Sequence, residues 1–218
     1  MHRSYMKTIS GIILLVVTGI LLSCSGGDDG GGTTEPEPFD AEATMAEAWN
    51  DFEAGLYEDA EEKFTEVIEH DSEDADAFLG RGWSKAFQSE FSSAVTDFLE
   101  ALEQGHADYD ADMGVAASYR DLPNYEGAIN YAKTVINNRP QYSFSRKPSI
   151  DYLDAHLIIA QSHFRLGGSH YSLAHEKINY LCKIEGLDTI PEYGTLPAED
   201  YEKLLAETLE ELTEIIGD

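Results

Sequence analysis

The feature that most constrains this chain is an internal repeat with a period of 34 residues. Three units follow one another without a break, and a fourth begins ten residues later with two extra residues in its inner turn. A period of this length predicts a solenoid, in which each unit packs mainly on its neighbours. The units span residues 41–74, 75–108, 109–142 and 153–184, and residues 143–152 form the insertion.

Four positions of the unit keep their chemical character throughout. The third and twentieth are alanine, the eighth is alanine or glycine, and the seventeenth is aromatic. Small side chains let two antiparallel helices approach closely, which explains the alanine and glycine positions. These are the packing positions of the tetratricopeptide repeat, and residues 41–184 resemble that family. The resemblance implies an all-α fold, a solenoid of about four helix-turn-helix repeats. In order, the positions hold Ala43, Ala77, Ala111 and Ala155; Ala48, Gly82, Ala116 and Ala160; Tyr57, Phe91, Tyr125 and Tyr171; and Ala60, Ala94, Ala128 and Ala174.

A solenoid leaves an apolar face uncovered at its last unit and needs a cap. Residues 185–218 supply a linker and then, after Pro197, apolar residues at helical spacing with acids on the other face. We therefore expect a C-terminal capping helix. Its apolar residues are Tyr201, Leu204, Leu205, Leu209, Leu212, Ile215 and Ile216.

Residues 1–23 have the organisation of a secretory signal peptide. Arg3 and Lys7 precede an apolar run of about 14 residues, which is short for a membrane span of roughly 20 residues. The segment ends Leu-Leu-Ser-Cys and resembles a bacterial lipobox, which implies that Cys24 becomes the acylated first residue of a lipoprotein. The alternative is a plain signal anchor with a chance cysteine.

Residues 24–40 are rich in glycine and acids and offer almost nothing to bury, which predicts a disordered tether. Cleavage would remove Arg3 and Lys7 but no acid, so the net charge would change from -28 to -30. Acidic lipid headgroups repel such a body, and the lipid itself must hold it to the membrane. Ser25 replaces the aspartate that retains enteric lipoproteins in the inner membrane. We therefore expect a lipid-anchored protein of the cell envelope, with the outer membrane favoured and its periplasmic or surface side left open.

Composition argues against several functions. The 42 acidic residues against 14 basic ones repel phosphate backbones, which excludes nucleic-acid binding as a main role. The chain has no phosphate-binding loop, Gly-x-Ser-x-Gly or HExxH motif. Four histidines gather in the fourth unit without the convergence that metal ligands need. We expect no enzyme, cofactor or metal, and we read Cys182 as a core residue. The four histidines are His156, His163, His170 and His175.

The resemblance implies that the first helix of each unit lines a concave groove. Trp49 and Trp83 fall at the same groove position one period apart. Exposed aromatic residues are typical of surfaces that bind protein segments, so these positions are candidates for partner binding. The alternative is that they pack on neighbouring helices as ordinary core. The groove candidates are Trp49, Phe52, Trp83, Phe87, Arg120 and Phe164.

Each unit also carries one acid at its second position. A row of carboxylates beside aromatic residues would suit a cationic partner. The stronger explanation is local, because the first turn of a helix stabilises negative charge. The four acids are Glu42, Asp76, Asp110 and Asp154.

The insertion and the residues before it form a second candidate surface. Arg139, Arg146 and Lys147 are concentrated here, beside Tyr142 and Phe144. A long loop that departs from a regular scaffold is often functional, so the three cations are candidates for partner contact. Alternatively, the loop folds back onto the acidic groove.

These features indicate a non-enzymatic scaffold, anchored to the bacterial envelope by lipid, that binds a protein or peptide partner along its groove. The alternative is a lipoprotein that binds a glycan or another nutrient, with the same tryptophans stacking on sugar rings. Metal-dependent catalysis is a third and weaker possibility.

Overall fold

The computed structural model describes residues 39–192 and 194–217, which form nine α-helices and one short 3-10 turn, η1, at Gly168–His170. The predicted signal peptide, Cys24 and the predicted tether up to residue 38 lie outside these residues. The helices are α1 (Ala41–Ala54), α2 (Tyr57–His70), α3 (Ala75–Phe87), α4 (Phe91–Glu103), α5 (Asp110–Asp121), α6 (Tyr125–Asn138), α7 (Tyr152–Leu166), α8 (Tyr171–Glu185) and α9 (Ala198–Ile216).

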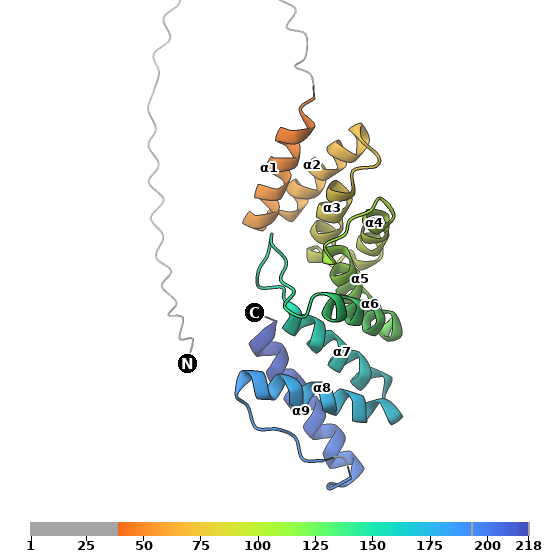
Figure 1. Cartoon of the computed structure of the whole chain (residues 1–218), viewed down its shortest axis with the longest axis vertical. Helices are drawn as coiled ribbons and strands as arrows, with labels where there is room; N and C mark the ends of the chain where they lie inside the picture. Colours follow the sequence, from red (N-terminus) through yellow and green to blue (C-terminus); the bar gives the residue numbers. More distant parts are fainter. Residues whose placement is uncertain (1–38, 193, 218) are drawn as a thin grey trace, which may run out of the picture. The chain divides into compact units, whose positions relative to one another are not determined.

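Helices α1 to α8 form four consecutive antiparallel pairs that stack in chain order, and α9 packs on the last pair (Figure 1). Each first helix contacts the first helix of the next pair, so that α1, α3, α5 and α7 form one row. Among the described helices, no such contact joins the second helices of successive pairs. The row of first helices is therefore the inner, concave face of the curved stack. The all-α solenoid of four repeats with a capping helix is confirmed.

Helix starts follow from local chemistry. The side chain of Asp40 accepts a hydrogen bond from the Ala43 backbone N–H at 3.0 Å and caps α1. Asp74 and Asp151 cap α3 and α7 in the same manner. Because such caps satisfy backbone donors that the first turn leaves unpaired, they fix where the first helix of a unit begins.

Adjacent units pack through one large and one small side chain. The Phe64 ring of α2 lies directly over Gly80 of α3, where even an added Cβ would come within 2.2 Å of the ring. One period later, the Phe98 ring covers Gly114 in the same way. At the third junction the sizes are reversed, because the equivalent positions hold Ala132 and Ile158, both buried.

The cap is held by both apolar and polar contacts. Tyr201, Leu205, Leu209 and Leu212 of α9 are buried in a cluster with residues of α7 and α8, as the helical spacing predicts, whereas Ile215 is exposed. Asn179 of α8 accepts a hydrogen bond from the Ile190 N–H at 2.7 Å and donates one to the Ile190 carbonyl at 3.1 Å. The linker before α9 is therefore fixed to the last repeat.

The core consists of two clusters of buried side chains. One cluster joins α1 to α7, a second joins α7 to α9, and the two meet on α7. Within residues 39–192 and 194–217, no helix combines the length and apolar character needed to cross a membrane.

Candidate functional site

Three of the five aromatic groove candidates are buried. Trp49 and Phe52 are 2% exposed and Trp83 is 3% exposed, whereas Phe87 is 36% exposed and Phe164 is half-buried. The expectation that they form an open surface is therefore wrong for the first three. The physical reason is a side chain from the insertion, Phe144, that fills the space between them.

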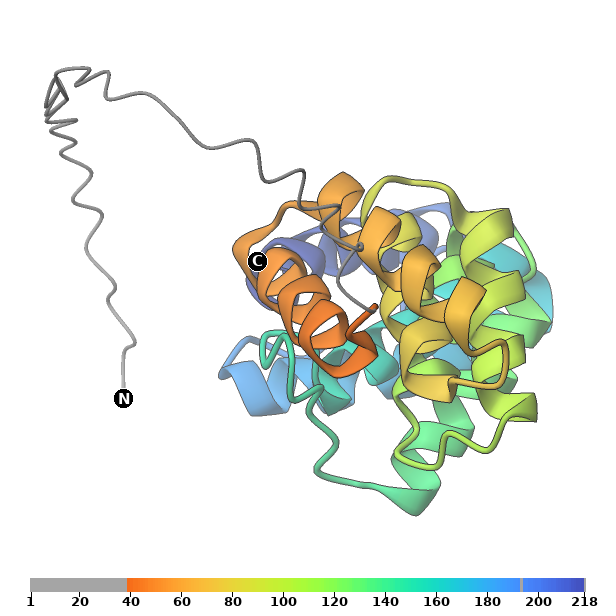
Figure 2. The same cartoon turned by 90° about the horizontal axis from the view of Figure 1, so that it is seen from above.

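The insertion folds as a small hairpin. The Phe144 N–H donates to the Ile150 carbonyl at 2.9 Å, and the Tyr152 N–H donates to the Tyr142 carbonyl at 2.9 Å. An antiparallel bridge joins Ser143 to Asp151. Residues 142–152, called the hairpin below, connect α6 to α7 and extend across the concave side to the end of α1 (Figures 1 and 2).

Phe144 is 0% exposed and sits among groove aromatics of α1 and α3. Its ring stacks on Trp83 with centroids 5.0 Å apart. It also meets the edges of Trp49 and Phe52 at 6.4 Å and 6.2 Å. Because an aromatic side chain is large, the Phe144 ring fills the half of the groove that α1 and α3 form.

The two cations at the hairpin tip also contact the groove. Arg146 pairs with Glu53 at 3.3 Å, and its guanidinium lies 4.7 Å from the centre of the Trp49 ring. The Lys147 ammonium lies 5.0 Å from the centre of the Phe87 ring. The hairpin thus folds back onto the groove, the alternative that the sequence left open. Arg139 does not take part, because it pairs with Asp108 at 3.2 Å.

The base of the hairpin adjoins a buried polar group. Asp110 lies at the start of α5, and its carboxylate is 3.7 Å from His106 Nε2. This carboxylate raises the pKa of His106. Burial, followed by the charge of Asp110, raises the pKa of Tyr142. The start of the hairpin therefore lies beside the first turn of α5, with the Tyr142 side chain buried.

The other acids of the predicted row lie in the first turns of their helices. Asp154 belongs to the capping box of α7, and burial raises its pKa to about 6. Asp76 accepts a hydrogen bond from Trp49 Nε1 at 3.3 Å. Glu42 is exposed in the first turn of α1. These positions agree with local stabilisation at helix starts.

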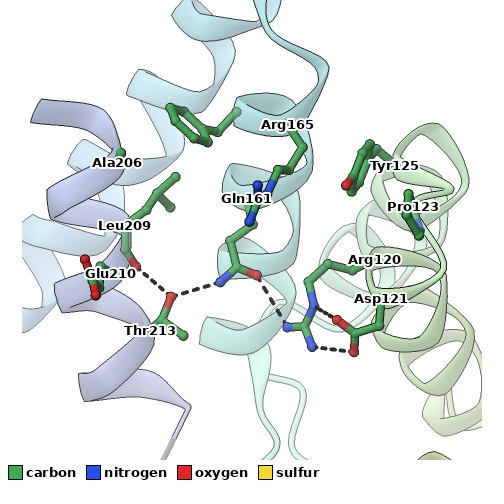
Figure 3. Close-up of a pocket in the computed structure, with 11 residues that line it drawn as sticks. Arg120, Asp121, Pro123, Tyr125, Gln161, Arg165, Ala206, Leu209, Glu210 and Thr213 are labelled. Carbon is green, nitrogen blue, oxygen red and sulfur yellow. Dashed lines mark hydrogen bonds and ion pairs between the residues drawn. The ribbon is translucent and has the colours of Figure 1, made fainter. Parts of the chain in front are cut away.

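Beyond the hairpin the concave side is hollowed. A cavity of about 700 Å³, called the C-terminal pocket below, lies between α5, α7 and α9. Figure 3 shows Arg120 and Gln161 pointing toward Thr213 across this space. Two of our six groove candidates, Arg120 and Phe164, therefore line an open cavity. The lining residues are Arg120, Asp121, Pro123, Tyr125, Gln161, Phe164, Arg165, Ala206, Leu209, Glu210 and Thr213.

A chain of hydrogen bonds crosses the floor of the C-terminal pocket (Figure 3). Arg120 donates two bonds to Asp121, at 3.1 and 3.0 Å, and one to Gln161 Oε1 at 3.4 Å. The Gln161 amide in turn donates to the Thr213 hydroxyl at 2.9 Å. Arg165, in contrast, has no ion-pair partner within the described part of the chain. Its guanidinium is the cation of the pocket that a ligand can engage.

A smaller cavity of about 270 Å³ separates the hairpin from the end of α9. Trp83, Phe87 and Lys147 form its wall on one side, and Ile216 contributes from α9. Sequence reasoning assigned α9 only a capping role and therefore missed Leu209, Thr213 and Ile216 as groove residues. Their helical spacing marks them as a cap, and only the packing angle of α9 brings them into the groove.

The histidines of the fourth unit do not form a metal centre. His163 Nδ1 and His170 Nδ1 are 3.0 Å apart, and burial lowers the pKa of His163 to about 4. His175 contacts Asn179 and Tyr201 instead. In the residues that the structure describes, no group of three or more histidine, cysteine or acidic side chains could hold a metal ion. Cys182 is buried, and burial raises the pKa of its thiol.

The fold matches solved tetratricopeptide-repeat proteins. The alignment with MamA has a TM-score of 0.53 and 17% identity, and it covers 82% of this chain and 83% of the MamA chain. YrrB, described as a TPR protein with an unusual peptide-binding site, aligns with a TM-score of 0.56 at 17% identity over 82% and 88% of the two chains. A tetratricopeptide repeat protein from Parabacteroides merdae aligns at 0.54 and 14% identity over 80% of this chain, which spans only 60% of that protein.

No protein-family model matches the sequence, and no curated protein matches it. Residues 41–185 nevertheless have the fold of tetratricopeptide-repeat proteins, with helix pairs and packing positions in the order that the family resemblance implies.

Proposed function

We propose that this protein is a non-enzymatic interaction scaffold that binds a segment of a protein partner in the C-terminal pocket. The observation that carries the proposal is the cavity itself. Its volume of about 700 Å³ falls in the usual range for ligand sites, and it opens on the inner face that repeat proteins use for binding.

The chemistry of the C-terminal pocket suits a peptide. Phe164 and Leu209 contribute apolar wall, while Gln161 and Thr213, which are hydrogen-bonded to each other at 2.9 Å, contribute polar groups. Arg165 supplies a cation without an ion-pair partner, which favours a carboxylate on the bound segment. The peptide-binding site described for YrrB supports this reading at the level of the fold.

The test compares a pocket variant with a matched surface variant. Arg165→Glu combined with Gln161→Ala changes the C-terminal pocket, whereas Lys203→Glu makes the same charge reversal at an exposed position of α9. After crosslinking in intact cells, the wild type and the Lys203→Glu protein should capture the same partner and the pocket variant should lose it. Equal capture by the pocket variant would refute the assignment.

Replacing the groove tryptophans is not a suitable test. Trp49 and Trp83 are buried, and truncating a buried aromatic residue to alanine costs about 3–5 kcal/mol. A double Trp→Ala variant would lose partner binding through loss of the fold. The pocket variant avoids this problem because Arg165 is exposed and Gln161 is half-buried.

We further propose that Cys24 carries a lipid that anchors the protein in the bacterial cell envelope, with the outer membrane favoured. The support is the charged start, the apolar run and the Leu-Leu-Ser-Cys ending of residues 1–24. Metabolic labelling with an azide-tagged palmitate should mark the wild type, and Cys24→Ala should abolish both the label and recovery in the membrane fraction. A labelled Cys24→Ala protein would contradict lipidation at this residue.

Glycan binding, the alternative, requires an indole face that is open to a sugar ring. Trp83 stacks on Phe144 at 5.0 Å, and Arg146 lies over the Trp49 ring. No observation favours the glycan reading over a protein partner. A change in tryptophan fluorescence on adding an oligosaccharide would reverse this preference.

A further inference from the structure

The hairpin occupies the groove in the way that a bound peptide would. Its receiving surface, called the aromatic seat below, consists of Trp49, Phe52, Glu53, Trp83 and Phe87. The aromatic ring of the hairpin is buried between helices α1 and α3, and both cations at the tip lie over aromatic faces with one acid in reach.

We propose that the aromatic seat is a recognition site for a partner segment in which an aromatic residue is followed, two and three positions later, by cations. The hairpin holds this site as an internal competitor, with Phe144, Arg146 and Lys147 in those three places. This inference rests on the proposed function in one respect, that the concave face binds protein segments. It adds the chemical class of the segment and the regulation of access.

The contacts between hairpin and seat allow exchange. The hairpin backbone makes its hydrogen bonds within residues 139–155, and the polar link to the seat is the Arg146–Glu53 pair, in which both side chains are more than 40% exposed. Exposed ion pairs of this kind contribute little to the stability of a fold. The hairpin can therefore leave the seat without breaking a backbone hydrogen bond to α1 or α3.

The aromatic seat contains a buried donor that the hairpin leaves without an acceptor. Trp83 Nε1 is buried and has no hydrogen-bond partner among the described residues. Buried donors in proteins are nearly always paired, and an unpaired one is costly. A segment with an acceptor at this point would satisfy the indole N–H and displace Phe144 with an advantage that the hairpin lacks.

Charge points to a cationic segment. The chain carries 42 acids against 14 basic residues, and at the seat Glu53 pairs with Arg146 while Asp76 bonds Trp49. Such a field speeds the approach of a cationic segment to the aromatic seat. Stacking on Trp49 and Phe87 then selects cations placed next to an aromatic residue.

The test supplies the hairpin sequence in trans. The probe is a fluorescein-labelled peptide, Tyr-Ser-Phe-Ser-Arg-Lys-Pro-Ser-Ile, which copies residues 142–150. The receiving protein is the full chain with Phe144→Ser, Arg146→Ser and Lys147→Ser, which empties the seat and keeps the hairpin length. Fluorescence anisotropy should show at least tenfold tighter binding to this variant than to the wild type, because the seat is no longer occupied.

Two control peptides define the specificity. Replacing the phenylalanine of the probe with alanine, or its Arg-Lys pair with Glu-Glu, should weaken binding to the emptied seat at least tenfold. As a protein control, Arg139→Ala removes a cation whose ion pair lies outside the seat and should behave like the wild type. Equal binding of all three peptides, or no gain over the wild type by the folded triple variant, overturns the inference.

A second variant covers the case in which the triple variant fails to fold. Arg146→Ala with Lys147→Ala keeps the buried Phe144 and changes only the tip, and it should bind the probe more tightly than the wild type. A folded tip variant with wild-type affinity also overturns the inference. The two proposals can fail separately. If the probe binds the emptied seat as expected but the Arg165→Glu, Gln161→Ala variant still captures the partner, only the function proposed for the C-terminal pocket is refuted. If that variant loses the partner but the probe does not bind the emptied seat, only the aromatic seat is refuted.

Discussion

Gly80→Ala reverses the usual effect of replacing glycine within a helix. In most helix interiors this change stabilises a protein by about 1 kcal/mol, because alanine has the higher helix propensity. Gly80 lies in the middle of α3 and faces the ring of Phe64 from the preceding unit. The new methyl group must enter a space that this ring already fills.

The contact distances set the magnitude. The added Cβ would lie 2.2, 2.4 and 2.6 Å from three ring atoms of Phe64, whereas carbon atoms in contact prefer about 3.5–4.0 Å. The ring cannot retreat easily, because it is 0% exposed and meets the edge of Trp49 at 4.9 Å. Overpacking costs about 1–3 kcal/mol. After the propensity gain, we expect a net loss of up to about 2 kcal/mol, which lowers Tm by up to roughly 8 °C.

Urea denaturation followed by circular dichroism measures this loss directly. Ala46→Gly is the matched control, since Ala46 holds the same repeat position in the exposed part of α1 and reports helix propensity alone. It should cost about 1 kcal/mol. Phe64→Leu combined with Gly80→Ala should recover part of the loss, because the smaller side chain frees space. A stabilising Gly80→Ala would refute the packing argument.

Three further changes probe the ionic cluster, the cap and the fourth unit. The ionic cluster consists of Asp97, which is 3% exposed, with Arg81 at 2.7 Å and Lys85 at 2.8 Å. Asp97→Ala should lower the free energy of unfolding, measured by urea denaturation, by about 3–5 kcal/mol. A loss below about 1 kcal/mol would contradict a stabilising role of the cluster. Asn179→Ala removes two hydrogen bonds to Ile190, so it should cost about 2 kcal/mol and speed proteolysis of the linker before α9; unchanged cleavage would show that the linker is held by other contacts. Burial lowers the pKa of His163 from 6.5 to about 4, so the unfolded state binds the proton first and stability falls as pH drops from 6.5 to 4, by roughly 3 kcal/mol. Burial lowers the pKa of His156 to about 4 as well, so His163→Leu should reduce the fall of Tm over this range without abolishing it. An unchanged profile would place the titrating group elsewhere.

The fold could be predicted because its determinants recur along the chain. Alanine or glycine at the third, eighth and twentieth positions marks where helices touch, and this pattern can be recognised without knowledge of distant residues. The N-terminal caps Asp40, Asp74 and Asp151 also act on their own helix alone. Such short-range interactions do not depend on residues far away in the chain.

The state of the groove could not be predicted in the same way. Trp49 and Trp83 lie on the inner face that the repeat pattern indicates, but Phe144 comes from an insertion that breaks the pattern. Two outcomes fitted the sequence equally, a loop turned to solvent and a loop folded back. In the structure, hydrogen bonds between residues of the hairpin and the burial of the Phe144 ring favour the loop that is folded back.

The sequence by itself therefore determined the repeat architecture, the capping helix and the identity of the inner face, because short-range periodic contacts specify them. Only the tertiary structure decided which part of that face is open. A hairpin from between the third and fourth units closes the first half with Phe144, and α9 and α7 enclose the C-terminal pocket of about 700 Å³. Both results depend on contacts between segments far apart in the chain, and no local pattern encodes where such segments meet.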